Sequence, residues 1–176
     1  WPSSNHGITV DHMDNVWIGG NGPDDGHILK FTRDGNFLLQ LGRPGIGTGS
    51  NDPENFGRVA EVSIDLGGDE VFVADGYGNR RVAVLDIETG ALKRYWGAYG
   101  NRPDDAPVPP YRPEDPPAQQ FRSPVHCAEI SDDDFVYVCD RASNRIQVFE
   151  RDGTFVREAF VATETLGSGS AWDLAF

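Results

Sequence analysis

The chain has 176 residues, and its 28 acidic and 15 basic side chains give a formal net charge of −13. This charge repels phosphate backbones and anionic lipid headgroups, so we expect neither nucleic acid nor a membrane surface as a partner. No apolar run approaches the ~20 residues of a membrane-spanning helix. The 21 Gly and 12 Pro residues predict many short strands and turns, and therefore an all-β chain.

The first predicted unit covers residues 6–42. Residues 7–10 alternate between apolar and other side chains as a half-buried strand does, and residues 16–18 form a second strand after a turn. A third strand is predicted over residues 28–31. The Asp34-Gly35 turn then opens the fourth, because Asp-Gly between apolar runs is a strong hairpin signal.

The same pattern returns in two further units, residues 60–97 and 126–160. Between the units lie residues 43–59 and 101–121, which are rich in Pro, Gly and Asp and are therefore expected to be loops. Residues 170–176, "SAWDLAF", match the first strand of a fourth unit. Repeats of four antiparallel strands without intervening helices are typical of β-propeller blades.

Three blades and the start of a fourth are fewer than the roughly four to eight that close a propeller. We therefore expect the chain to belong to a larger ring, in which the remaining blades of a parent chain are its partners. The alternative is self-association, in which a second copy of the chain completes the ring.

The two cysteines, Cys127 and Cys139, are either one disulfide bridge or two free thiols. They fall on strands that we expect to be adjacent. By their positions in the repeat they are not expected to face each other, and this favours free thiols.

Two stretches carry a family resemblance: "VFVADGYGNRRVAVLD" (71–86) and "VYVCDRASNRIQVFERDGTFV" (136–156). Both resemble the NHL repeat, with an Asp before a turn and Asn-Arg at the entry to the third strand. Together with "HGITVD" and "YWGAYG", in this order and spacing, they resemble the six-bladed propeller of the peptidyl-α-hydroxyglycine α-amidating lyase family over nearly the whole chain. This resemblance implies a six-bladed ring, a small-molecule or peptide substrate at the channel mouth, zinc, calcium as a further ion, and a secreted or periplasmic location.

His6 and His126 occupy one position of the repeat, just before the innermost strand, and Ala60 and Trp172 hold that position in the other units. The two histidines are on alternate blades, so a third on a later blade would complete a three-histidine zinc site with an open position. The lyase resemblance places His6 and His126 at two of the family's zinc ligands. The alternative is that both are polar channel residues with water partners. The remaining histidines, His12 and His27, are interpreted as surface residues.

Tyr77 and Arg141 lie in the turns after the second strands of units two and three. An antiparallel second strand ends where the first began, so both turns are expected near His6 and His126. The resemblance implies that Tyr77 removes a proton from the substrate hydroxyl and that Arg141 holds negative charge. The alternatives are a turn aromatic on the blade edge for Tyr77 and an inter-blade ion pair for Arg141.

Asp75 and Asp140 each precede one of these turns and are interpreted as structural acceptors for backbone N–H groups or for Arg80 and Arg145.

Two functions follow from the whole pattern. One is a zinc lyase that cleaves a carbinolamide N–C bond, and the other is a non-catalytic NHL propeller that binds a protein or small ligand. The identity of the substrate lies beyond the sequence.

Overall fold

The computed structural model describes residues 1–45, 47–65 and 67–176. Residues 46 and 66, which belong to the predicted loop 43–59 and to the turn of the second unit, lie outside the described residues. The described residues form three four-stranded antiparallel sheets, each in the order of the sequence. No α-helix occurs in these ranges, and only two 3₁₀ turns accompany the strands. The all-β prediction is therefore confirmed.

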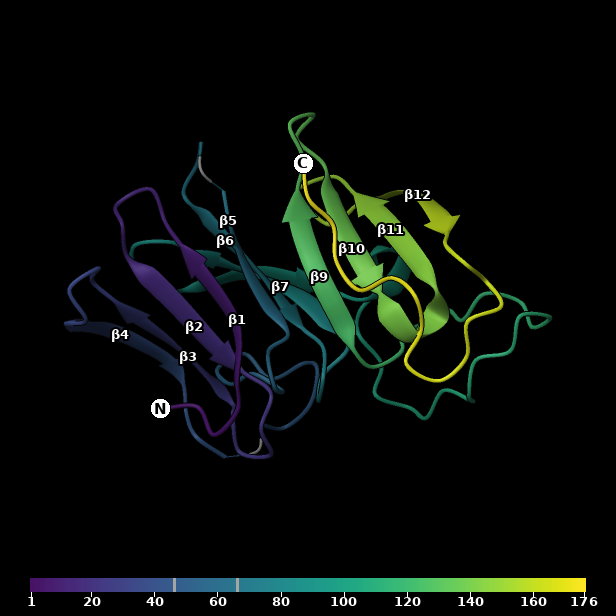
Figure 1. Ribbon diagram of the computed structural model, residues 1–176, viewed down its shortest axis with the longest axis horizontal. Coiled ribbons are helices and arrows are strands. Elements are labelled where there is room, and N and C mark those ends of the chain that lie inside the picture. Colours follow the sequence, from purple (N-terminus) through teal and green to yellow (C-terminus); the bar gives the residue numbers. More distant parts are fainter. Residues whose placement is uncertain (46, 66) are drawn as a thin grey trace.

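The three sheets are the three predicted blades (Figure 1). Blade one contains β1 (Asn5–Val10), β2 (Val16–Gly20), β3 (His27–Phe31) and β4 (Phe37–Gly42). Blade two contains β5 (Glu61–Ile64), β6 (Glu70–Asp75), β7 (Arg81–Asp86) and β8 (Leu92–Trp96). Blade three contains β9 (Val125–Ile130), β10 (Val136–Asp140), β11 (Arg145–Phe149) and β12 (Phe155–Phe160). The 3₁₀ turns are η1 (Ala98–Gly100) and η2 (Arg141–Ser143).

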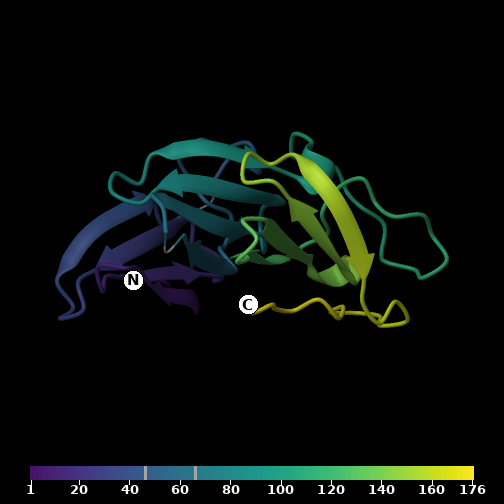
Figure 2. The same cartoon turned by 90° about the horizontal axis from the view of Figure 1, so that it is seen from above.

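The sheets follow one another around an arc (Figure 2), and the first strands β1, β5 and β9 contact one another in sequence along it. One apolar core fills the space between blades one and two, around Trp17, Val73 and Leu85. A second core lies between blades two and three, around Phe72, Val138 and Phe149. The blades are thus held together face to face by the alternate apolar side chains of their strands.

Residues 170–176, expected to begin a fourth blade, form no strand with the described residues. They lie against blade three, where Ala171 and Leu174 pack on Cys127 and Cys139. This segment therefore has the position beside blade three that β5 has beside blade one, without the hydrogen-bonded ladder of a strand. No helix in the described part of the chain is long and apolar enough to cross a membrane.

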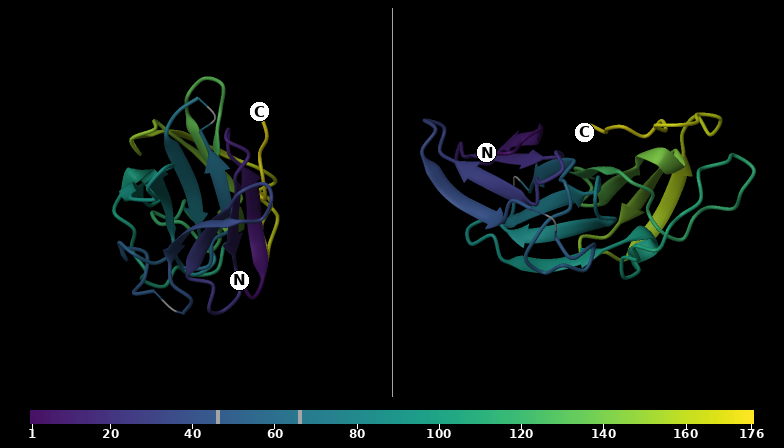
Figure 3. Two further views of the ribbon diagram at one scale, coloured as in Figure 1. Left: turned by 90° about the vertical axis from the view of Figure 1, so that its left-hand side faces the viewer. Right: turned by 90° about the horizontal axis from the view of Figure 1, so that it is seen from below.

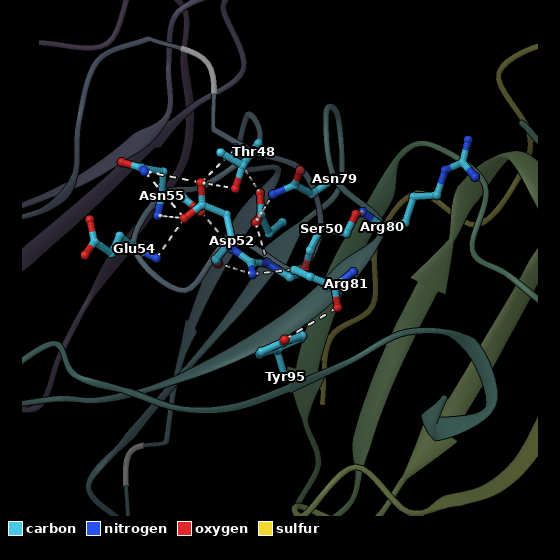
Figure 4. Close-up of polar contacts among 12 residues, drawn as sticks. Thr48, Ser50, Asp52, Glu54, Asn55, Asn79, Arg80, Arg81 and Tyr95 are labelled. Atoms are coloured by element: carbon cyan, nitrogen blue, oxygen red, sulfur yellow. Dashed lines mark hydrogen bonds and ion pairs between the residues drawn. The ribbon is translucent and has the colours of Figure 1, made fainter. Parts of the chain in front are cut away.

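The loop that precedes β5 is fixed by a buried arginine of blade two (Figure 4). Arg81 is ion-paired with Asp75 at 2.8 Å and donates to the carbonyl oxygens of Ser50, Asp52 and Asn55. In the same view the side chain of Arg80 points away from this network. The prediction that Asp75 pairs with Arg80 is therefore wrong. The turn after β6 is one residue longer than the turn after β10, so Arg81 takes the place that Arg145 has opposite Asp140.

The same arrangement recurs in blade three. Arg145 is fully buried, pairs with Asp140 at 2.8 Å and donates to the carbonyl of Gln120 in the longer loop. That loop extends beyond the sheets beside blade three (Figure 3). Both inter-blade loops are therefore anchored by an Asp–Arg pair at the end of the second strand, the end at which the predicted site residues also lie.

Candidate functional site

Four side chains singled out from the sequence meet at one end of the sheets. His6 lies on β1, His126 on β9, Tyr77 in the turn after β6, and Arg141 at the start of η2. The imidazole centroids are 5.4 Å apart, and the Tyr77 ring is 5.2 Å from that of His6 and 5.9 Å from that of His126. Cζ of Arg141 lies 5.7 Å from the Tyr77 ring. The structure brings all four together, while their chemical roles remain predictions.

The Tyr77 turn is held against blade three by close backbone packing. Gly76 touches the backbone of Val125, and a Cβ at this position would overlap the Val125 carbonyl. Ser123, two residues earlier, donates from Oγ to the carbonyl oxygen of Tyr77 at 3.0 Å. Because Val125 directly precedes His126, these contacts set the tyrosine beside the histidine.

The two histidines are oriented in the same way. Nδ1 of His6 is 2.6 Å from the carbonyl oxygen of Ala60, and Nδ1 of His126 is 2.5 Å from that of Trp172. A carbonyl oxygen only accepts hydrogen bonds, so Nδ1 carries a proton in both rings, and in the neutral form of each ring Nε2 has a free lone pair. Ala60 and Trp172 hold the same position of the repeat, so each histidine is fixed by the segment that follows its blade.

The Nε2 atoms of the two rings have different surroundings. Nε2 of His6 lies 3.3 Å from Oη of Tyr77, and the hydroxyl is the donor because the nitrogen has no proton. Nε2 of His126 is buried and has no hydrogen-bond partner among the described residues. Leaving a buried acceptor unpaired costs about 1–3 kcal/mol. Two imidazoles with fixed tautomers and one orphaned Nε2 fit a zinc ion, whose preferred ligands include neutral imidazole nitrogen.

The electrostatics of His126 favour its neutral form. Burial lowers the pKa of His126. The hydrogen bond to the Trp172 carbonyl acts to raise this pKa, and the nearby positive charge of Arg141 acts to lower it. A depressed pKa means that the ring is unprotonated at neutral pH, which is the form that binds metal. His126 can therefore bind a cation without first losing a proton.

Arginines surround the tyrosine. Arg141 donates from Nη1 to Oη of Tyr77 at 3.3 Å, donates from Nε to the carbonyl of Ser168, and stacks on the Trp172 ring at 4.2 Å. Arg58 lies on the Tyr77 ring with its Cζ at 5.9 Å. Sequence reasoning did not single out Arg58, which has a left-handed backbone (φ 67°) in an irregular loop and belongs to no repeat motif. The contact of Trp172 with Arg141 was not predicted from the sequence either.

A second group of potential metal ligands does not fit a metal. Glu61, Cys127 and Asp173 lie within 4.8 Å of one another, but the sulfur of Cys127 is bonded to Cys139. Burial and the charge of Glu129 raise the pKa of Glu61 to about 8, so this carboxyl is protonated at neutral pH. A disulfide sulfur and a neutral carboxyl are poor ligands for zinc or calcium. This group is therefore a poor candidate for the calcium implied by the resemblance, and the calcium site stays a prediction.

The interpretation of the cysteines as free thiols was wrong. Cys127 and Cys139 form a disulfide, with Cα atoms 4.8 Å apart, and they are directly opposite each other on β9 and β10. The register shifts next to this pair, between Cys139 and Asp140, which our alignment of the repeats did not include.

The interpretation of His27 as a surface residue was also wrong. It begins β3, is 2% exposed, and has an Nδ1 without a hydrogen-bond partner among the described residues. The loop after β4 covers this end of β3, since the carbonyl of Gly26 accepts a hydrogen bond from Phe56. His12 is exposed, as expected.

Comparison with known proteins gives relatives of two kinds. The chain is 30% identical over 161 residues to peptidyl-glycine α-amidating monooxygenase B of Xenopus laevis, a match that covers 87% of the chain and 16% of that protein. It is 27% identical to a probable peptidyl-α-hydroxyglycine α-amidating lyase of Caenorhabditis elegans, over 82% of the chain and 36% of the lyase. It is 31% identical to NHL repeat-containing protein 3 of Mus musculus, over 97% of the chain and 43% of that protein.

The resemblance predicted from the sequence is confirmed. No family model matches the chain. The chain spans less than half of the length of each of these three relatives. Among solved structures, virginiamycin B lyase from Staphylococcus aureus superposes with a TM-score of 0.59 at 16% identity, over 92% of the chain and 43% of the lyase. At this identity the likeness shows the fold alone, which is that of NHL-type propeller blades.

Proposed function

We propose that this chain provides two zinc ligands and the catalytic tyrosine of a lyase that cleaves the N–C bond of a carbinolamide such as peptidyl-α-hydroxyglycine. The products are an amide and glyoxylate. The observation that carries the proposal is the matched pair of histidines beside Tyr77: their Nδ1 atoms are held by carbonyls, Nε2 of His6 contacts the Tyr77 hydroxyl, and Nε2 of His126 is buried without a partner among the described residues. The sequence similarity to amidating enzymes supports the choice of reaction.

In this reaction Tyr77, as phenolate, takes the proton of the substrate hydroxyl while the carbon–oxygen double bond of glyoxylate forms. The carbon–nitrogen bond breaks and its electron pair stays on nitrogen. The amide nitrogen gains one proton, which balances the proton taken up by Tyr77 and is returned by it, so that no water or redox partner is consumed. When bound at the two Nε2 atoms, zinc would polarise the substrate hydroxyl. A metal ion on Nε2 of His6 would replace the hydrogen bond that Nε2 receives from Tyr77. Oη of Tyr77 would then keep its hydrogen bond from Arg141.

The two arginines beside Tyr77 have complementary tasks. Arg141 already contacts Oη and is held by Ser168 and Trp172, so it stabilises the phenolate that accepts the proton. Arg58 donates from Nε to the carbonyl of Asn21 and has no carboxylate partner among the described residues. Its guanidinium is suited to the carboxylate that the substrate carries and that leaves in glyoxylate.

The proposal is tested with the complete protein by metal analysis and by turnover of an N-acyl-α-hydroxyglycine. His126→Ala is expected to lose zinc, whereas Tyr77→Phe should keep zinc and lose on the order of 10²–10⁴ in kcat, because only the proton acceptor is removed. His12→Ala is the control, since this exposed histidine lies in a turn away from the site. Glyoxylate release reports turnover. Normal zinc content in His126→Ala, or near-normal kcat in Tyr77→Phe, would refute the assignment.

The second candidate is a non-catalytic NHL propeller that binds a protein or small ligand. It is favoured by the match to NHL repeat-containing protein 3, which covers more of the chain than the amidating enzymes do. This reading requires that the complete protein bind no zinc and release no glyoxylate, so the same two measurements separate the candidates.

A further inference from the structure

A groove of about 360 Å³ runs alongside the candidate site. One wall is the segment 108–111 of the long inter-blade loop, and the other is formed by the turns that carry Arg80, Ser123 and Ala142. These turns belong to the same end of the sheets as Tyr77 and Arg141.

The inner end of the groove is in direct contact with the site. Ser123 donates to the carbonyl of Tyr77, and Ala142 follows Arg141 in η2. Gly167, which also lines the groove, precedes Ser168, whose carbonyl receives the Nε hydrogen of Arg141. The groove therefore lies next to the turns that carry Tyr77 and Arg141.

The charged residues that line the groove are two arginines, Arg80 and Arg122. Neither forms an ion pair in the described part of the chain, although the protein has 28 acidic residues. Arg80 donates to the carbonyl of Ala106, and Arg122 donates to that of Pro109. Carbonyl groups hold these guanidinium groups in place without neutralising their charge. One acid, Asp115, lines two neighbouring hollows that Arg122 also lines, and it does not line this groove.

The opposite wall is apolar and stiff. Pro109 and Pro110 have fixed φ angles and no N–H groups, and Tyr111 is tied to the carbonyl of Thr163 by a 2.9 Å hydrogen bond from its hydroxyl. Nε of Arg122 is buried and has no hydrogen-bond partner among the described residues. An extended peptide with a carboxylate side chain matches such a groove, because its chain packs on the prolines and its charge meets the arginines.

We propose that this groove binds the residues that precede the reacting group of a peptidyl substrate and that Arg80 and Arg122 select an acidic side chain there. The reacting group rests on the proposed function, whereas the preference for an acidic peptide does not. Arg80 and Arg122 are therefore specificity residues outside the catalytic centre.

The test compares peptidyl-α-hydroxyglycine substrates that differ only in Glu, Gln or Lys at each of the three positions before the reacting residue. At one of these positions the complete protein should prefer Glu over Gln by about five- to tenfold in kcat/KM, the effect of one charge-assisted contact near the surface. Arg80→Gln and Arg122→Gln should each reduce this preference. Arg112→Gln is the matched control, because this arginine lines the neighbouring hollow and not the groove.

A parallel measurement keeps this proposal separate from the lyase. Fluorescence anisotropy with a labelled peptide that carries Glu, against the same peptide with Gln, reports binding without turnover. Tighter binding of the Glu peptide that is lost in Arg122→Gln and at high salt supports the groove even when no substrate is cleaved. Equal turnover or equal binding of the Glu and Gln peptides would refute the proposal that the groove selects an acidic side chain. It would not contradict the proposed lyase reaction. A thermal melt of each variant excludes loss of folding as the cause.

Discussion

Glu61 and Glu129 are acidic side chains on the neighbouring inner strands β5 and β9. Glu61 accepts a hydrogen bond from the backbone of Ala128 at 2.9 Å, and Glu129 accepts one from Oγ of Ser63 at 3.0 Å. Burial raises the pKa of Glu129, and burial together with the charge of Glu129 raises that of Glu61 to about 8. The folded chain thus keeps a proton here that the unfolded chain releases near pH ~4.3.

This sets a direction for stability against pH. Between about pH 4.5 and pH 8 the folded state binds more protons than the unfolded state at this position, so the free energy of unfolding falls as pH rises. Glu61→Gln keeps the acceptor for Ala128 and removes the ionisation. We expect the variant to melt about 4 °C or more above wild type near pH 8.5 and to match it near pH 4. Calorimetry of the complete protein across this pH range measures the difference in melting temperature. Exposed Glu88→Gln is the control. A difference in melting temperature that stays constant at all pH values would contradict the prediction.

The site residues differ in how well the sequence predicts them. His6, His126 and Tyr77 were found because the repeat fixes where a strand starts and where a turn follows it. Arg58 was missed because its position depends on a loop without a repeat pattern. The cysteine pairing was missed because a shift of one residue in strand register changes every opposing pair, and the register depends on turn and bulge geometry.

At the scale of the elements, the two Asp–Arg pairs connect blades two and three to the loops before them. Asp75 accepts from the backbone N–H of Gly57 and from Arg81, and Asp140 accepts from that of Arg122 and from Arg145. The strands and their order follow from apolar alternation and Asp-Gly turns, which is why the blades could be predicted. The path of the long loops could not, because it depends on which carbonyls a buried arginine reaches.

The adjacent arginines of blade two provide a matched comparison. Arg81→Met removes the partner of a fully buried Asp75 and three hydrogen bonds to the loop, so we expect it to destabilise the fold by about 3–5 kcal/mol. Arg80→Met should cost less than about 1 kcal/mol, since Arg80 pairs with no carboxylate in the described structure. Urea denaturation of both variants of the complete protein measures this. Equal losses would mean that the buried pair has no special part in anchoring the loop.

At the scale of the whole molecule, the three blades form an arc with apolar side chains open at both flanks. Ile8 and Val10 are exposed on β1, and Trp172 and Phe176 are exposed on the segment beside blade three. Exposed apolar patches and uncovered blades favour association. The arc was predicted from the number of repeats, whereas the packing of residues 170–176 without a strand was not, because strand formation there requires a partner that the repeat pattern does not reveal.

Residues 1–176 expressed alone are therefore expected to self-associate or to unfold without a sharp transition. Sedimentation velocity at several concentrations and a urea titration measure this. Ile8→Lys, on the exposed flank of β1, should reduce the association, whereas Arg33→Lys keeps a surface charge and should change nothing. A monodisperse wild-type monomer with one cooperative unfolding transition would show that the arc is stable by itself.

The disulfide of blade three has a consequence for local unfolding. The bond joins Cys127 to Cys139, directly beside His126 on one strand and beside Asp140 and Arg141 on the other. Proteins open locally at free energies below that of global unfolding, and outer strands are among the first parts to exchange their amide hydrogens. When β12 and β11 detach in such an event, the covalent link still limits the separation of β9 and β10. The histidine and the arginine therefore remain neighbours in a partly opened blade, and the site can re-form without a new search for strand pairing.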